Sequence, residues 1–189
     1  MAPAVDRGSR KVGGSRMIIA IARTTMLAAA LGSASAALAA PEKGSQKTRD
    51  FVQAAAASDT FEMVESYSAL AESRDPQVRS FAEQMLRDHG QTSQRLQQAA
   101  TSSGLKQPVM QVDGQQSQFL AALQSARGPD FDKTYWRQQA FAHRSALLAQ
   151  QQYAASGDTP AVRQAAQSAV PLIQSHLAMA EQMSARAGN

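Results

Sequence analysis

The chain has 189 residues, no cysteine and a formal net charge of +4 from 19 basic and 15 acidic side chains. Residues 1–39 hold five of the basic side chains and one of the acidic, so the other 150 residues carry fourteen of each sign. This balance leaves no basic excess for holding nucleic acid or an anionic membrane, so neither partner is expected, and the absence of cysteine excludes disulfide bonds.

Residues 1–39 have the three parts of an export signal. A basic start is followed by the apolar run "MLAAALGSASAALAA", and residues 37–39 form a small-residue cleavage motif. The apolar run is too short for a spanning helix, and a lipid anchor would need a cysteine near the cut. We therefore expect cleavage before Ala40 and a periplasmic or exported protein without a transmembrane segment after cleavage. Translation can start at Met1 or at Met17, because a shorter signal of the same kind begins at Met17.

Residues 40–50 are polar and predict a flexible tether before a single domain over residues 51–186. The domain is rich in good helix formers and lacks β-branched runs with period two, so we expect an all-α fold. The first helix is predicted near residues 51–73. Two assignments of its inward face are possible. One places Phe61 and Val64 on it, and the other follows a pattern of residues spaced four and three apart. That pattern consists of Phe51, Ala55, Ser58, Glu62, Glu65 and Ala69.

The second helix is predicted to start at Pro76, where a missing N–H costs nothing, with Asp75 as its N-cap. A heptad seam follows, which places His89 at a core position. The seam consists of Val78, Ala82, Met85, His89, Thr92, Leu96 and Ala99. The Gly, Pro and Ser residues after this helix predict a long connection, with a short extra helix over residues 115–126.

The third helix is predicted to begin near Asp130 as its cap, and the fourth at Pro160 with Asp158 or Thr159 as its cap. One stripe of the third helix consists of Trp136, Ala140, His143, Leu147 and Ala154. The seam of the fourth consists of Val162, Ala166, Ala169, Ile173, His176, Ala180 and Met183. Pro171 removes one backbone hydrogen bond from the fourth helix and predicts a kink about one turn before the seam histidine.

Four helices with these stripes predict an antiparallel four-helix bundle. In such a bundle, residues equidistant from a tight turn lie side by side. By this rule Glu62 and His89 pair about 20 Å from the first turn, and His143 and His176 pair about 25 Å from the last. We therefore expect all three histidines to meet in one core layer. The helix order stays open, because the long connection can continue up and down or cross over.

Four blocks of the chain resemble, in order, one bacterial family: "FVQAAAASDTFEMVESYSALA", "DPQVRSFAEQMLRDHGQTSQRL", "FDKTYWRQQAFAHRSAL" and "AVPLIQSHL". It is the uncharacterised ferritin-like family of exported proteins often labelled "predicted outer membrane protein", and the resemblance covers residues 50–183. It implies a ferritin-like bundle outside the cytoplasm with no established activity. The residues that match its motifs are Glu62, Asp88, His89, His143 and His176. The sequence pattern gives no support to the outer-membrane label.

Two main interpretations of the histidine layer stay open. In the first, three imidazoles and a carboxylate bind one zinc, iron or copper ion inside the bundle. The ligands would be Glu62, His89, His143 and His176, with Asp88 and Asp132 as outer carboxylates. A di-iron site is not expected, because the Glu-x-x-His pattern of such sites is missing. The positions three before the histidines are Leu86, Ala140 and Ile173.

In the second interpretation the layer is structural, and neighbouring carboxylates satisfy the core histidines. Asp132 would pair with His143 and Glu62 with His89, while Asp88 would pair with a basic side chain at the helix boundary. The protein would then be a non-catalytic module of the cell envelope, acting in stress tolerance as a homo-oligomer or with an envelope partner. A pH sensor, in which the imidazoles charge together below about pH 6, is a third alternative. Hydrolase chemistry has no support in the spacing of Ser and Thr.

Overall fold

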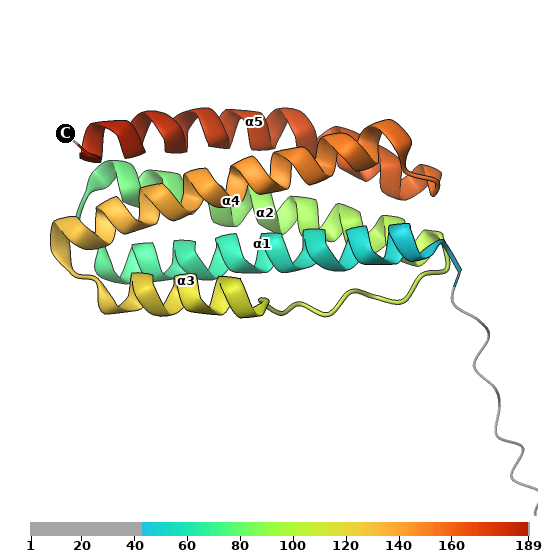
Figure 1. Ribbon diagram of the computed structural model, residues 1–189, viewed down its shortest axis with the longest axis horizontal. Coiled ribbons are helices and arrows are strands. Elements are labelled where there is room, and N and C mark those ends of the chain that lie inside the picture. The colour runs from blue at the N-terminus through green and yellow to red at the C-terminus, as the bar shows by residue number, and fades with distance from the viewer. Residues whose placement is uncertain (1–42, 189) are drawn as a thin grey trace, which may run out of the picture. The chain divides into compact units, whose positions relative to one another are not determined.

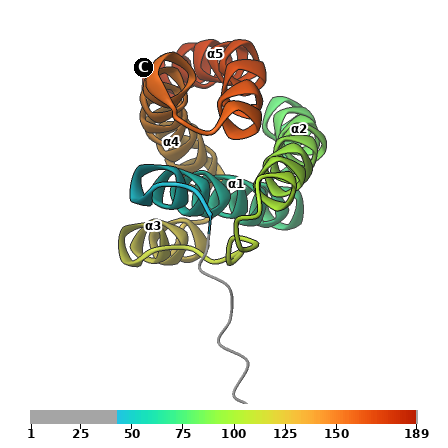
Figure 2. The same cartoon turned by 90° about the vertical axis from the view of Figure 1, so that its right-hand side faces the viewer.

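The computed structural model describes residues 43–188, and five α-helices make up most of this range (Figure 1). They are α1 (Gln46–Glu72), α2 (Pro76–Ser102), α3 (Gly114–Ser125), α4 (Gly128–Ser156) and α5 (Pro160–Gly188). The helices α1, α2, α4 and α5 form the four-helix bundle that the sequence predicted, and α3, the predicted extra helix, packs outside against α1 and α4 (Figure 2). The predicted signal over residues 1–39 lies outside the described residues.

The long connection crosses over. Lys47 Nζ, at the start of α1, donates to the carbonyl of Ser156, at the end of α4, at 2.9 Å. The hydroxyls of Ser66, late in α1, and Tyr135, early in α4, lie 3.3 Å apart. α1 and α4 are therefore antiparallel neighbours, and residues 103–127, which include α3, run back along α1 to reach the start of α4 (Figure 1).

α1 begins at Gln46, five residues before the predicted start. Ser45 caps the helix by accepting the backbone N–H of Thr48 at 3.1 Å, and the buried Thr48 hydroxyl lies 2.6 Å from that of Tyr153. These contacts hold the first turn, so residues 46–50 are helical instead of forming a tether. The hydrophobic pattern missed this turn because its side chains are polar.

α2 starts as predicted, since the Asp75 carboxylate accepts the backbone N–H groups of Gln77 at 2.7 Å and Val78 at 3.2 Å. The predicted cap of α4 was wrong. This helix starts at Gly128 and leaves Asp130 in its first turn. Gly128 has a φ of 53°, a conformation that favours glycine, and it turns the chain directly into the helix.

Replacing Asp75 by alanine is expected to lower the free energy of unfolding by about 1 kcal/mol, because two backbone N–H groups lose their acceptor. Asp75→Asn keeps a side-chain oxygen at the cap and is the matched control. Urea denaturation followed by circular dichroism measures both variants. An equal loss in the asparagine and alanine variants would contradict the capping role.

α5 starts at Pro160, as predicted, and stays helical through Pro171 to Gly188. Within residues 43–188, no helix combines the length and apolar character needed to cross a membrane.

A polar layer divides the hydrophobic core into two clusters. The cluster toward the α1–α2 turn includes Phe81, Met85, Phe131, Trp136 and Met183. The cluster toward the α4–α5 turn includes Phe51, Leu96, Tyr153, Val162 and Ala166. All predicted seam positions of α5 are buried, and so are those of α2 apart from the half-buried Thr92. The seams therefore bring their histidines into the layer between the clusters.

α1 buries two of its faces. Glu62 and Glu65 have no exposed surface and face the polar layer. Phe61 is 1 % exposed, and its ring centroid lies 6.3 Å from that of Phe119 on α3. α3 therefore covers the side of α1 that carries Phe61, and the two glutamates occupy the side that faces the bundle interior.

Candidate metal centre

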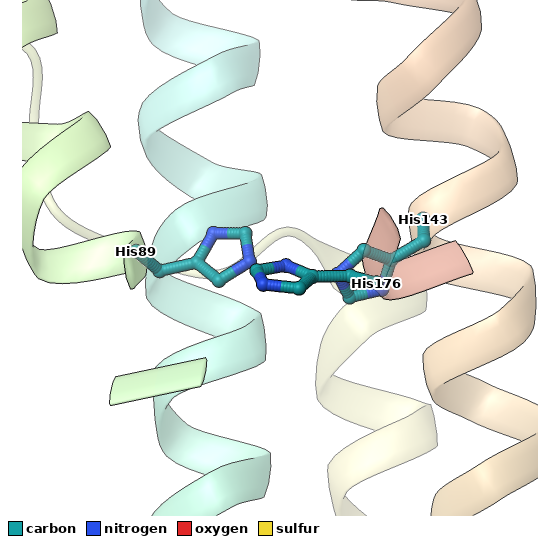
Figure 3. Close-up of side chains that lie close together, drawn as sticks. All are labelled: His89, His143 and His176. Atoms are coloured by element: carbon teal, nitrogen blue, oxygen red, sulfur yellow. The ribbon is translucent and has the colours of Figure 1, made fainter. Parts of the chain in front are cut away.

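The three histidines of the chain meet inside the bundle, each from a different helix (Figure 3). His89 comes from α2, His143 from α4 and His176 from α5, with ring centroids 5.3 to 5.5 Å apart. One ligand atom of each lies within 4.8 Å of the others, and none of the three residues is more than 1 % exposed. Their equal distances from the turns had predicted this shared layer.

Each imidazole is held by one hydrogen bond to an atom that can only accept. The bonds are His89 Nδ1 to Asp59 Oδ1 (2.8 Å), His143 Nδ1 to the Gln139 carbonyl (2.8 Å) and His176 Nε2 to Asp88 Oδ2 (2.9 Å). Because carboxylates and carbonyls have no proton to give, the named ring nitrogen must be the donor in each case. The acceptors therefore fix the orientation of all three rings and the tautomer of each neutral ring.

The opposite nitrogen of each ring is buried and has no hydrogen-bond partner among the described residues. These atoms are His89 Nε2, His143 Nε2 and His176 Nδ1. In a neutral imidazole with the tautomer just described, each of these nitrogens carries a lone pair. With all three rings neutral, three buried lone pairs from three helices would form the donor set of a metal ion that prefers imidazole.

Asp59 on α1 is a member of the layer that the sequence analysis missed. Besides the His89 N–H, its carboxylate accepts the hydroxyl of Thr92 at 3.1 Å and that of Ser93 at 2.9 Å. Its position three residues before Glu62 puts both on one face of α1, which is the signal that would have indicated it. Asp59 therefore holds the His89 ring in place, and two hydroxyl groups hold the Asp59 carboxylate.

Glu62 lies in the layer, as predicted, but it faces the anchored nitrogens. Its Oε2 is 3.0 Å from His89 Nδ1 and its Oε1 is 3.7 Å from His143 Nδ1. The His89 N–H is directed to Asp59, and from the described residues neither oxygen of Glu62 accepts a hydrogen bond of good geometry. Glu62 therefore places negative charge behind two of the rings, on the side away from their unpartnered nitrogens.

The pKa values in the layer separate one charged histidine from two neutral ones. Burial alone would lower the pKa of His89, but Glu62 and Asp59 outweigh it and raise this pKa to about 10. Burial, with the charge on His89, lowers the pKa of His143 to about 4 and brings that of His176 below its usual range. Burial opposes ionisation of Glu62, yet the imidazoles, His89 foremost, bring its pKa below the usual value. The metal-free layer at neutral pH therefore holds one imidazolium.

Of the two outer carboxylates expected from the sequence, Asp88 and Asp132, only one belongs to the layer. Asp88 takes part, because its carboxylate accepts the His176 N–H. The expectation for Asp132 was wrong: it accepts the hydroxyl of Ser73 at 2.6 Å, at the end of α1. Eleven residues of helix put Asp132 about 16 Å from His143 along the axis of α4, and the Gln139 carbonyl holds that histidine instead.

Glu65 is a second buried carboxyl group on the inner face of α1. Its Oε2 accepts the Gln139 side-chain N–H at 2.7 Å, and its Oε1 has no hydrogen-bond partner among the described residues. Burial raises the pKa of Glu65 well above its usual value, and the negative charge of Glu62 acts in the same direction. The folded protein therefore keeps this proton to a higher pH than the unfolded chain does.

Glu65→Gln is expected to stabilise the protein at pH 7 by on the order of 2 kcal/mol and to flatten the loss of stability with rising pH. The unfolded chain loses this proton first, so each pH unit between the unfolded and folded pKa values costs the folded state about 1.4 kcal/mol. Glutamine cannot ionise and still accepts from Gln139. Urea denaturation from pH 5 to 8 measures the slope, with Glu83→Gln at an exposed site of α2 as control. An unchanged slope would contradict a proton held by Glu65.

A family model described as Domain of unknown function (DUF4142) matches residues 33–183. A solved structure, a DUF305 fragment from Deinococcus radiodurans, resembles the chain with a TM-score of 0.66 and 15 % sequence identity, over 77 % of this chain and 99 % of that one. At this identity the likeness shows a common helical fold alone. No curated protein matches the chain. Because the family model spans well over half of the sequence, the chain belongs to the DUF4142 family, an uncharacterised one as the resemblance implied.

Proposed function

We propose that the protein binds a divalent transition-metal ion through His89, His143 and His176. One observation carries this proposal: each buried imidazole has one nitrogen fixed by a protein acceptor and the other without a hydrogen-bond partner. Metal-binding histidines have this arrangement, because the outer hydrogen bond sets the tautomer and aims the lone pair at the ion. A core histidine with a purely structural role is expected to satisfy both nitrogens.

The charges around the rings favour a cation at this place. Asp59 and Glu62 lie within 3.0 Å of His89 Nδ1, and Asp88 lies 2.9 Å from His176 Nε2. A protonated His89 compensates one of these negative charges, whereas a divalent ion bound to a neutral His89 compensates two. Buried charges are costly unless they are compensated, so the site gains from the exchange of a proton for the ion. Glu62 supports the site through this charge and not as a ligand.

Imidazole nitrogens suit zinc, copper and iron, and these are the ions proposed. Three protein ligands leave a tetrahedral ion one further position for water or a small molecule. This donor set fits a protein that binds its ion reversibly. Catalysis is not part of the proposal.

One observation favours the alternative of a structural layer. The His89 imidazolium lies between Asp59 and Glu62, and this buried network joins α2 to α1 without any metal. A network of that kind fixes helix register in some proteins. It accounts for the Nδ1 side of His89 but leaves one nitrogen of each of the three rings without a partner among the described residues, and for this reason the metal site is preferred.

We further propose that the protein is exported and works outside the cytoplasm as a ferritin-like bundle. The support for export is the basic start, apolar run and cleavage motif of residues 1–39. The support for the ferritin-like class is the single long crossover between the two helical pairs, which is the connection typical of such bundles. Fractionation of the native host with an antibody to residues 43–188 tests the location.

Titration of the metal-free, untagged protein with zinc, copper and iron, followed by elemental analysis after gel filtration, tests the metal site. We expect one ion per chain in the wild type and none in His89→Ala, His143→Ala or His176→Ala, because the chain has no other histidine and no cysteine. Glu181→Gln, which removes an exposed partner of Arg144, is the control. Stoichiometric binding that survives all three histidine variants, or no binding by the wild type, would refute the proposal.

A further inference from the structure

A surface groove leads between α2 and α5 toward the histidine layer. Its open part has a volume of about 370 Å³. A narrow crevice of about 10 Å³ continues it inward, since Arg95, Ala165 and Ser168 line both. The inner part is also lined by Asp59 and Ala169. The groove and crevice therefore lead from the surface to the edge of the layer at Asp59.

The inner end of the crevice is one hydrogen bond from a proposed metal ligand. The Asp59 side chain lines the crevice and is 11 % exposed, while its Oδ1 accepts the His89 N–H at 2.8 Å. The side chain of Glu62 behind it has no exposed surface. Elsewhere on the two helices, the hydrogen bond from His176 Nε2 to Asp88 Oδ2 joins α5 to α2.

The width of the crevice determines how an ion could pass. A volume of about 10 Å³ holds about one water molecule, so a hydrated divalent ion must lose part of its water and the two helices must separate locally. Removing water from an ion is costly unless a charged or polar group of the protein replaces it. The carboxylate of Asp59 is such a group. On the α5 side the lining is Ala165, Ala166, Ser168 and Ala169, whose small side chains offer few contacts to be broken when the helices separate.

Resting on the proposed metal site, we propose that this groove is the route by which a divalent metal ion reaches the three histidines. Asp59 is the first carboxylate that the ion meets inside the bundle, and because Asp59 bonds His89 Nδ1, the ion must then pass the His89 ring to reach the three unpartnered nitrogens. Arg95, exposed and lining both parts of the groove, places a positive charge at the narrowing and slows the passage of a cation. The rate of uptake is then set by the α2–α5 seam, and the affinity by the histidines.

Stopped-flow mixing of the metal-free full chain with copper(II) alone separates these two quantities. Trp136 is the single tryptophan, and its ring lies 5.0 Å from that of Phe81, which lies 6.0 Å from the ring of His176, so quenching of its fluorescence reports the bound ion. Ala169→Leu is expected to lower the association rate constant about tenfold, because the seam must open further. Arg95→Gln is expected to raise it about threefold. Both variants should keep the Kd of the wild type within about twofold.

Two variants are matched controls and should keep the wild-type rate. Arg87→Gln makes the same change of charge at an exposed site of α2 outside the groove, and Ala185→Leu makes the same enlargement at an exposed site of α5. If Ala169→Leu does not fold, Ala165→Leu obstructs the same groove from a half-buried position.

Wild-type association rates in the leucine variant and in Arg95→Gln would overturn the route and leave the metal site intact. Equal acceleration by Arg87→Gln and Arg95→Gln would also overturn it, since net charge would then explain the effect. A weaker Kd at an unchanged association rate in the leucine variant would contradict it as well, because an obstruction acts on the rate. Failure of the wild type to bind any ion at equilibrium would refute the metal site itself.

Discussion

Saturating zinc is expected to raise the free energy of unfolding of the metal-free protein by about 4 kcal/mol when the free ion is held at a thousand times its Kd. An ion that binds the folded state alone stabilises it by mass action. The three imidazoles come from three helices and are within 5.5 Å of one another only when α2, α4 and α5 are packed, so the unfolded chain offers no comparable site. Urea denaturation with and without zinc measures the gain.

His143→Gln is the most informative variant for this effect. The ring of His143 is neutral, and its replacement leaves the charged network of His89, Asp59 and Glu62 in place. We expect this variant to unfold at the same urea concentration with and without zinc, while Glu181→Gln at the surface keeps the full gain. If the layer is only structural, zinc will leave the wild type unchanged and His143→Gln will lose the same stability in both conditions.

Phe61→Ala is expected to lower the free energy of unfolding by about 3 to 5 kcal/mol, the usual cost of removing a buried phenylalanine ring. Phe61 is 1 % exposed and lies between α1 and the outer helix, where its ring faces Phe119. The cavity would therefore open under α3 and leave the histidine layer intact. Hydrogen exchange of the amides in α3 should become faster than in the wild type, and this increase should exceed that in the bundle helices. Zinc binding should be unchanged.

Tyr67→Ala on the same helix is the matched control, because Tyr67 is 64 % exposed. Removing this ring should change the stability by less than about 0.5 kcal/mol. Equal losses in the two variants, or unchanged exchange in α3 of Phe61→Ala, would contradict the view that Phe61 holds α3 on the bundle.

The seams of α2 and α5 could be predicted from the sequence almost residue by residue, and with them the core positions of His89 and His176. Both helices begin with a proline, which indicates where they start. Both also carry apolar residues at a regular spacing, so the local pattern alone predicts the buried face of each helix. The tight turns then gave the heights of the histidines. α1 was harder to predict, because its polar first turn and its two buried faces carry no single stripe.

The sequence by itself determined an all-α bundle and a shared layer of three histidines, since periodicity sets which face of a helix is buried and turn position sets the height of each residue. Only the tertiary structure decided the crossover, the covering of Phe61 by α3, and the choice of Asp59, the Gln139 carbonyl and Asp88 as anchors in place of Asp132. A polar side chain bonds whatever acceptor lies within about 3 Å, and that distance depends on how the helices are rotated and staggered, which local pattern does not encode.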